Sequence, residues 1–276
     1  MDYWQYNIHT DKETAELLLA YLSSSLFESF EETEEGLCAY LPHVPGWQEQ
    51  AEALLRALQR DYLLQWKTQF LPEQNWNAVW EGNFSPVIIE DFCAVRAPFH
   101  SPVQGVAVEL VLEPKMAFGT GHHETTWMCL KALRDLPCAD ARLLDFGCGS
   151  GILAILAARL GAKEVIALDV EESAFHSAIE NSRINDVGDK VRVYWGSLEK
   201  LTDEVFDGIM ANITRNVILA SLEELHRRLC EGGWLLVSGI LNKDAEEVCA
   251  AAERVGFLLE NQAKRGEWRC LTFKRV

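Results

Sequence analysis

The chain has 276 residues, a length that suits one or two domains with hydrophobic cores of their own. Hydrophobic residues at 49% and charged residues at 24% are ordinary globular values and exclude a disordered or fibrous chain. The formal net charge of −17 disfavours general binding to nucleic acid or to an anionic membrane surface, since both require cationic protein surface.

The negative charge is concentrated near the N-terminus. Residues 1–60 carry 11 acidic and 3 basic side chains, a net charge of −8, whereas residues 116–276 have a net charge of −5. Two interpretations of the acidic region stay open: a solvated face, or a docking surface for a cationic ligand. A basic partner is permitted, because opposite net charge raises the rate of encounter.

The sequence predicts a cytoplasmic protein with no membrane segment and no metal site. The first six residues have neither the basic nor the apolar region of a signal peptide, and no uncharged apolar run reaches the roughly 18–20 residues of a membrane helix. The eight cysteines form no C-x-x-C pair and no zinc-like cluster. We therefore expect reduced, mostly buried thiols.

Residues 1–71 have a helix and strand pattern of their own. The predicted elements are a strand at 3–9, a helix capped by Thr10 or Asp11, a strand pair at 26–30 and 37–41, a helix after Gly46 and a strand at 62–71. This βαββαβ order predicts a small ferredoxin-like α+β domain, which is an independent two-layer unit.

Residues 72–85 are rich in Asn, Gln, Trp, Gly and Pro, which predicts a linker in which Trp76 and Trp80 act as a structural anchor. The second predicted domain covers residues 86–276. Its expected strands lie at 87–89, 94–97, 106–112, 142–145, 165–169, 191–195, 208–211 and 234–238, with a closing antiparallel hairpin at 257–261 and 270–274. Near-continuous apolar strands that alternate with helices predict a doubly wound α/β domain around a parallel sheet.

A loop with two glycines precedes the first helix of this alternation. Its sequence is Phe118-Gly119-Thr120-Gly121-His122-His123-Glu124-Thr125-Thr126. Glycines that bracket small hydroxyl residues predict a loop that folds over a polar ligand, with Thr125 or Thr126 near the helix cap. Taken alone, the string also fits an ordinary capped loop.

A glycine-rich turn joins the strand at 142–145 to the next helix. Its sequence is Asp145-Phe146-Gly147-Cys148-Gly149-Ser150-Gly151-Ile152. Glycines let a backbone approach a ligand closely, and the helix N-terminus supplies free N–H donors. Asp169, 22 residues after Gly147, ends the next strand, where an acid accepts hydrogen bonds from ribose hydroxyls. Turn and acid together predict a nucleotide-like cofactor.

Two classes of cofactor use such a turn. A dinucleotide fingerprint needs its third glycine at the position of Ile152, one residue after Gly151. The spacing Asp-x-Gly-x-Gly-x-Gly is instead similar to motif I of the class I S-adenosylmethionine-dependent methyltransferases. This resemblance implies a Rossmann-like fold for residues 86–276 and S-adenosylmethionine as the cofactor.

A third motif follows the fourth parallel strand and reads Met210-Ala211-Asn212-Ile213-Thr214-Arg215. Ligands of α/β sheets bind at this edge. In amino methyltransferases an Asn or Asp at this place accepts a hydrogen bond from the target amine, which makes Asn212 the candidate catalytic residue. The prolines and the aromatic residue that often follow are missing, which disfavours methylation of an extracted nucleobase. The alternative is a turn-forming Asn.

The loop at 118–126 and the glycine-rich turn together resemble the ribosomal protein L11 methyltransferases of the PrmA type. The resemblance extends to Ser238-Gly239-Ile240-Leu241 and takes in the tryptophan-containing linker and the small N-terminal domain. The loop departs from the family at His122, commonly a threonine, and at Glu124, commonly a proline. His123 matches the family histidine, and we interpret it as a surface or loop-bracing residue rather than a catalytic one.

The resemblance implies a protein N-methyltransferase that transfers methyl groups from S-adenosylmethionine to lysine ε-amines and the N-terminal α-amine of ribosomal protein L11. The implied cofactor-binding residues are Thr126, Gly147, Gly149, Gly151, Asp169 and Asn212, with Asn212 also catalytic. Residues 1–71 are the implied substrate-recognition domain. We expect a monomer that binds the basic ribosomal protein and makes no direct contact with nucleic acid or membrane.

The sequence leaves three alternative functions open. An RNA methyltransferase with the same catalytic domain predicts a basic appendage, whereas residues 1–60 are acidic. A dehydrogenase is disfavoured by the position of the third glycine, and binding of NAD against S-adenosylmethionine separates the two. The third alternative is a noncatalytic binding module with the same fold. Incorporation of methyl groups from labelled cofactor distinguishes an active enzyme from such a module.

Overall fold

The computed structural model of the chain describes residues 2–23, 25–33, 35–71, 85–113, 119 and 121–276. It divides into two compact units, Met1–Phe84 and Ser85–Val276. Apart from Ser85, the predicted linker with Trp76 and Trp80 lies outside the described residues.

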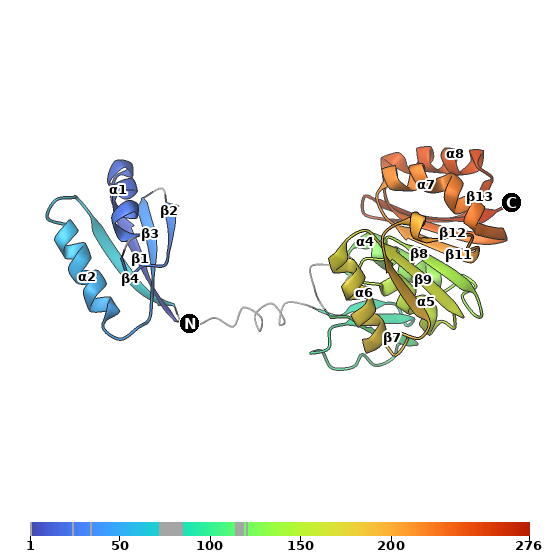
Figure 1. Ribbon diagram of the computed structural model, residues 1–276, viewed down its shortest axis with the longest axis horizontal. Coiled ribbons are helices and arrows are strands. Elements are labelled where there is room, and N and C mark those ends of the chain that lie inside the picture. Colours follow the sequence, from blue (N-terminus) through green and yellow to red (C-terminus); the bar gives the residue numbers. More distant parts are fainter. Residues whose placement is uncertain (1, 24, 34, 72–84, 114–118, 120) are drawn as a thin grey trace. The chain divides into compact units, whose positions relative to one another are not determined.

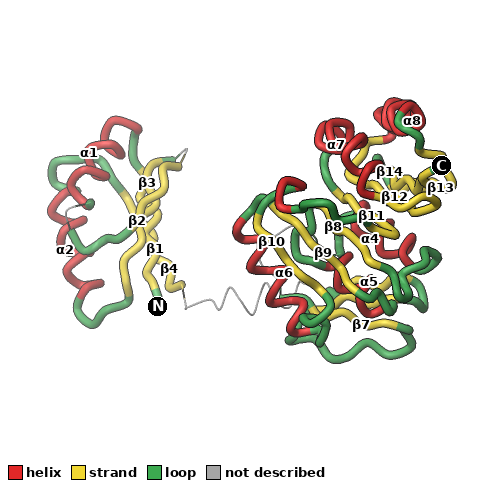
Figure 2. The backbone as a smooth tube through the Cα atoms, turned by 45° about the vertical axis from the view of Figure 1, so that its right-hand side comes forward, coloured by secondary structure: helices red, strands yellow, loops and turns green. Residues whose placement is uncertain are grey.

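The N-terminal unit is a four-stranded antiparallel sheet with two helices on one face (Figures 1 and 2). Its elements are β1 (Tyr3–His9), α1 (Lys12–Leu22), β2 (Ser29–Thr33), β3 (Gly36–Pro42), α2 (Trp47–Leu58) and β4 (Gln65–Leu71). The strand order β2-β3-β1-β4 is that of the ferredoxin-like fold, so the predicted fold is confirmed. Alternate residues of β1, such as Tyr6 and Ile8, face the helices and form the core with both helices.

Local physics explains the element boundaries in this unit. Asp11 is the N-cap of α1, because its side chain accepts a hydrogen bond from the Thr14 N–H at 3.0 Å. The strand expected at 26–30 begins at Ser29 instead, since Phe27 packs edge-on against Tyr6 in the core. The strand expected at 62–71 begins three residues late, because the end of α2 still hydrogen-bonds onward as far as residue 62.

The C-terminal unit is built on a seven-stranded sheet of order β10-β9-β8-β11-β12-β14-β13. Its strands are β8 (Arg142–Phe146), β9 (Glu164–Asp169), β10 (Val191–Trp195), β11 (Phe206–Asn212), β12 (Leu229–Leu241), β13 (Phe257–Arg265) and β14 (Trp268–Arg275). All neighbours are parallel except β14, which runs antiparallel to β12 and β13. The predicted doubly wound fold and its closing hairpin are therefore confirmed.

Helices cover both faces of this sheet (Figure 2). They are α4 (Glu124–Leu133), α5 (Ile152–Arg159), α6 (Glu172–Ile184), α7 (Arg215–Arg228) and α8 (Ala245–Arg254). Leu143 and Leu144 of β8 are both fully buried but belong to different hydrophobic clusters, one with α4, α5 and α6 and the other with α7 and α8. Burial on both faces explains why these strands appear in the sequence as continuous apolar runs.

A small three-stranded sheet precedes the large one in the chain. It consists of β5 (Val87–Ile89), β6 (Cys93–Arg96) and β7 (Val108–Val111). Its buried residues Ile89, Val95 and Leu110 join the cluster of α4 and α5. This small sheet therefore packs on the side of the main sheet that α4 and α5 cover.

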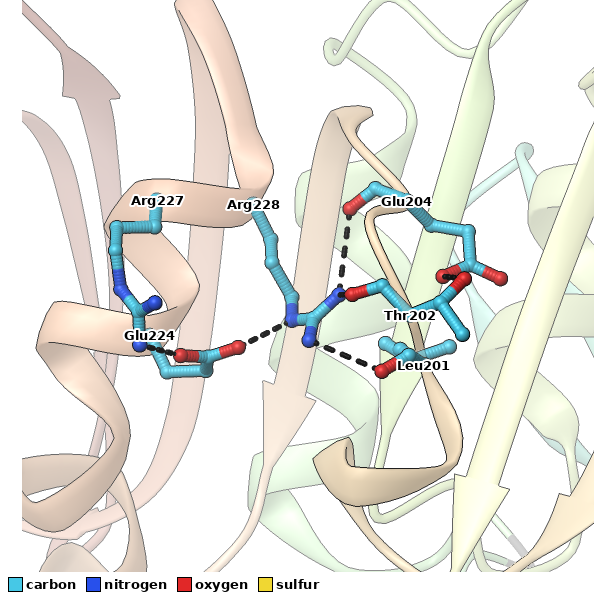
Figure 3. A network of polar contacts seen from close by, with 6 residues as sticks. All are labelled: Leu201, Thr202, Glu204, Glu224, Arg227 and Arg228. Carbon is cyan, nitrogen blue, oxygen red and sulfur yellow. Dashed lines mark hydrogen bonds and ion pairs between the residues drawn. The ribbon is translucent and has the colours of Figure 1, made fainter.

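Arg228 at the end of α7 fastens that helix to the segment before β11 (Figure 3). Its guanidinium donates to the backbone carbonyls of Leu201 at 3.3 Å and Thr202 at 3.1 Å, and its Nε lies 2.6 Å from Glu224 Oε1. Arg227 also pairs with Glu224 but lies on the solvent side. The partly buried arginine thus supplies hydrogen-bond donors to backbone carbonyls of an irregular segment.

Two further features concern the chemistry that the chain can support. The eight cysteines are free, and six of them are buried. Within the described ranges, no helix is long and apolar enough to cross a membrane, and no group of three or more His, Cys, Asp or Glu side chains could hold a metal ion.

Candidate active site

The carboxyl ends of β8, β9 and β11 meet at one edge of the sheet, where they open onto a cavity of about 740 Å³. Parallel strands place their carboxyl ends together, so residues far apart in the sequence converge there. The volume is in the range that small-molecule ligands occupy. Among the predicted site residues, the cavity is lined by Gly147, Gly149, Asp169 and Asn212.

The glycine-rich turn has the backbone that its sequence predicts. Gly147 has φ of +77°, and a Cβ there would lie 2.2 Å from Cγ2 of Ile213. Its N–H and that of Cys148 donate to the Leu168 carbonyl at 2.8 and 2.9 Å, which fixes the turn against the end of β9. Gly151, with φ of +80°, is the N-cap of α5 and packs against Ala178 of α6. Only glycine meets both demands of conformation and space.

Asp169 links this turn to helix α6. One carboxylate oxygen accepts the Gly149 N–H at 2.8 Å, and the other accepts the Glu171 N–H at 3.0 Å. Each carboxylate oxygen can accept a further hydrogen bond. Because Asp169 also lines the cavity, it can receive two neighbouring hydroxyl groups of a bound ribose.

Asp145 lies behind the turn and is fully buried. Burial raises the pKa of its carboxyl to about 7, the charge of Asp169 acts in the same direction, and a hydrogen bond from the Ala154 N–H at 3.0 Å opposes both. Its Oδ1 has no hydrogen-bond partner among the residues that the structure describes. Asp145 is therefore a structural acceptor for the first turn of α5, with an unusually low tendency to ionise.

The loop before α4 leads into a helix whose N-cap is His123. The His123 Nδ1 accepts the Thr125 N–H at 3.3 Å and lies 2.8 Å from Thr125 Oγ1, which satisfies one of the free N–H groups of the first turn. Thr125 and Thr126 lie in that first turn, near the cap as predicted, and both are buried. The position of His123 fits its interpretation as a bracing residue, and it also lines the cavity. Phe118 and Thr120 of this motif lie outside the described residues.

Asn212 ends β11 with one half of its amide engaged. Its Nδ2 donates to Thr126 Oγ1 at 3.3 Å. Its Oδ1 is buried and has no hydrogen-bond partner within the described part of the chain. A buried acceptor without a partner costs on the order of 1–3 kcal/mol, so it is expected to be completed by a ligand. The arrangement offers an acceptor to an N–H group that enters the cavity.

Residues 23–276 match the family described as ribosomal protein L11 methyltransferase (PrmA). The chain belongs to this family. The family consists of S-adenosylmethionine-dependent methyltransferases, so the predicted family, enzyme class and cofactor are confirmed.

Individual relatives agree with the family assignment. A ribosomal protein L11 methyltransferase of Porphyromonas gingivalis is 42% identical over 95% of this chain and 91% of its own length. One from Bacteroides thetaiotaomicron is 34% identical over 99% of both chains. A solved structure of a ribosomal protein L11 methylase from Lactobacillus delbrueckii subsp. bulgaricus superposes with a TM-score of 0.65 at 28% identity, over 70% of this chain and 99% of that one.

Two predicted cofactor residues of this family member take supporting positions. The described residues that line the cavity do not include Thr126 or Gly151. Thr126 contacts Asn212, and Gly151 packs α5 against α6. Direct contact of either residue with the cofactor stays a prediction.

Sequence reasoning missed several residues of the cavity wall. Trp268, at the start of β14, lies edge-on to His123 with ring centroids 4.9 Å apart. Ile213 lines the cavity and its carbonyl lies so close to Gly239 that a Cβ there would be 2.1 Å away. Ser197, two residues after the end of β10, also lines the cavity. Only the pairing of β14 with β12 brings Trp268 to this edge, and extending the predicted hairpin by two residues would have included it.

Proposed function

We propose that this protein transfers methyl groups from S-adenosylmethionine to amines of ribosomal protein L11, with lysine ε-amines and the N-terminal α-amine as acceptors. The proposal rests on the cavity that joins the glycine-rich turn, Asp169 and Asn212, whose Oδ1 has no hydrogen-bond partner among the described residues. Relatives that are named for this activity align over almost the whole chain.

The residues of the cavity fit the cofactor. Gly147 and Gly149 have no side chain to obstruct a ligand, and Asp169 retains free lone pairs for ribose hydroxyls. Thr126 and Gly151 support this arrangement from behind. When bound, S-adenosylmethionine supplies a methyl group on a positively charged sulfur.

The acceptor amine must be neutral to react, and a free lysine has a pKa of about 10.4. Apolar side chains of the cavity, such as Phe146, Ile213 and Trp268, disfavour a cation and so lower the pKa of an amine that enters. Asn212 Oδ1 then accepts an amine N–H and turns the nitrogen lone pair toward the methyl group. The proton released after transfer passes to water, since these motifs supply no general base. Positioning of this kind lowers reaction barriers by on the order of 7–11 kcal/mol in favourable cases.

The N-terminal unit is proposed to capture the protein substrate. Residues 1–71 hold none of the cofactor motifs, form a fold of their own and include the acidic segment of net charge −8. Opposite charge favours encounter with a basic ribosomal protein. Tethering the substrate raises the local concentration of its amines at the catalytic cavity, and residues 72–85 are proposed as the hinge that lets several amines reach it. We further propose that the enzyme acts as a cytoplasmic monomer.

Mass spectrometry of purified ribosomal protein L11 tests the function directly. After incubation with enzyme and S-adenosylmethionine, we expect mass increments of whole methyl groups on lysines and on the N-terminal amine. The Asn212→Ala variant serves as the matched control. An unmodified protein substrate would contradict the proposal, and labelled methyl groups found in ribosomal RNA would favour the RNA methyltransferase alternative.

A further inference from the structure

Asn181 places a fully buried amide in the last turn of helix α6, outside the cavity lining of the described residues. Its Oδ1 accepts the backbone N–H of Glu113 at 2.9 Å. Its Nδ2 donates to the backbone carbonyl of Ser150 at 2.9 Å and lies 3.3 Å from Ser177 Oγ. One side chain thus ties the segment after β7 to the glycine-rich turn.

Ser150 extends the connection to the loop before α4. The Ser150 Oγ donates to the carbonyl of Gly119 at 2.7 Å. A Cβ on Gly119 would lie only 2.8 Å from the Ser150 Oγ, so the two residues are in close contact. Ser150 itself stands between Gly149, whose N–H is bonded to Asp169, and Gly151, which packs on α6. Any movement of Ser150 therefore moves backbone that lines the cavity.

Helix α6 contacts the cofactor residues at two places along its length. It starts three residues after Asp169, which accepts the N–H of Glu171. Further along, Ala178 at its centre and Asn181 in its last turn contact the glycine-rich turn. Since a helix is stiff and a buried amide with its hydrogen bonds satisfied is costly to disturb, these contacts fix turn and acid relative to one another.

We infer that Asn181 and Ser150 are positioning residues, which hold the glycine-rich turn, Glu113 and Gly119 in the arrangement that binds the cofactor. The inference rests on the proposed use of this cavity for S-adenosylmethionine. It predicts that loss of either side chain weakens cofactor binding, although neither needs to touch the cofactor.

Asn185, the C-cap residue of α6 and four residues after Asn181, offers a matched control. It is also buried, and its amide is bonded to both backbone groups of Val111, at 2.9 and 2.6 Å. Nδ2 also donates to the Asn181 carbonyl at 2.8 Å. Within the described residues, its side chain makes no hydrogen bond to the glycine-rich turn or to Gly119. Asn185→Ala therefore removes the same kind of buried contact without releasing the turn.

Calorimetric titration of the full-length chain with S-adenosylmethionine, well below each variant's Tm, tests the inference. Asn181→Ala should raise the Kd about tenfold, and Ser150→Ala should raise it in the same direction. The Asn185→Ala variant should lose thermal stability comparably while its Kd stays within about twofold. Because the two residues form one connection, the Kd of the double variant should rise by less than the product of the single changes. At saturating cofactor and substrate, kcat of Asn181→Ala should stay within about threefold of the parent value.

Several outcomes would overturn the positioning role. Unchanged Kd in both Asn181→Ala and Ser150→Ala contradicts it, and if Asn181→Ala fails to fold, Ser150→Ala decides alone. An equal rise in Kd for Asn185→Ala would show general loosening of α6 instead. A parent chain that binds no S-adenosylmethionine contradicts the proposed cofactor as well, whereas normal parent binding with unaffected variants contradicts only the positioning role.

Discussion

Asn212 divides its amide between the protein and the cavity. Thr126 fixes the Nδ2 end, and the Oδ1 end stays without a partner among the described residues. This division favours a role in orienting an acceptor amine over a simple turn-forming role, because a turn needs no buried free acceptor.

Asn212→Ala should therefore lower kcat by about tenfold or more, the equivalent of ~1.4 kcal/mol or more of lost transition-state stabilisation. The Kd for S-adenosylmethionine should change far less. Steady-state kinetics and calorimetry on the same preparation measure the two effects. Equal losses in kcat and in affinity would place the side chain with the cofactor, and near-normal turnover would argue against any side-chain role.

Asp169 is expected to act on affinity instead. Asp169→Ala removes the acceptor for the Gly149 N–H and for ribose hydroxyls, so the Kd for S-adenosylmethionine should rise about 5- to 150-fold, or 1–3 kcal/mol. Glu172→Ala, an exposed acid in the first turn of α6, is the matched control and should leave the Kd unchanged. An unchanged affinity in Asp169→Ala would contradict the ribose assignment.

The buried carboxyl of Asp145 makes the stability of the folded protein depend on pH. Its folded pKa of about 7 exceeds the value of about 3.9 expected in the unfolded chain, so the folded state binds more protons between these two values. Its contribution to stability is therefore greatest below about pH 4 and falls as the pH rises toward 7. Asp145→Asn removes the ionisable carboxyl, so the variant does not lose this stability as the pH rises. The Tm of the variant minus the Tm of the parent should therefore increase from pH 5 to pH 8. A Tm difference that is independent of pH would contradict the buried, raised pKa.

At the scale of elements, the contact of α7 with the segment before β11 depends on one arginine. Arg228 is 12% exposed and donates to backbone carbonyls, whereas Arg227, on the same Glu224, is 74% exposed. The partly buried contacts of Arg228 should contribute more to the free energy of unfolding than the exposed Arg227–Glu224 pair. Removing Arg228 takes donors away from backbone carbonyls, whereas exposed ion pairs contribute little.

Arg228→Ala should lower the free energy of unfolding by about 1–3 kcal/mol, and Arg227→Ala by less than about 1 kcal/mol. Arg228→Lys should restore little of the lost free energy of unfolding, because an ammonium group lacks the planar set of N–H donors with which a guanidinium reaches several carbonyls at once. Denaturant titration of the three variants provides the measurement. Equal losses for the two alanine variants would show that the buried contacts of Arg228 add nothing.

At the scale of the whole molecule, the chain separates cofactor chemistry from proposed substrate capture. Every residue assigned to the cavity belongs to the unit Ser85–Val276. The acidic segment with a net charge of −8 lies in the other unit. Binding of the cofactor and binding of the protein substrate should therefore respond to different changes.

Removal of residues 1–71 should leave the Kd for S-adenosylmethionine almost unchanged and nearly abolish methylation of ribosomal protein L11. Added salt should weaken capture by the full-length enzyme, because screening reduces attraction between exposed charges. Methylation assays and calorimetry on both chains measure the effects. A folded, truncated enzyme that methylates at the full-length rate would leave residues 1–71 as a stabilising appendage.

The fold class and the local parts of the site could be predicted from the amino-acid sequence. Apolar runs separated by helices specified a sheet buried on both faces, and the spacing from Asp145 through Gly151 to Asp169 specified the cofactor turn. These features depend on backbone conformation and on neighbours close in the chain, so a single sequence contains them.

The side chains that complete the cavity wall could not be predicted, because they come together through packing of distant elements. Trp268 reaches the edge because β14 pairs with β12, and Asn181 meets Ser150 because α6 packs on the turn. His123 faces the same cavity because it caps α4 and packs edge-on against Trp268. Each of these contacts joins groups whose geometry is set by packing rather than by local preference. Sequence patterns record which residues are apolar or polar, but the partner that satisfies a buried polar group is chosen when the elements pack together.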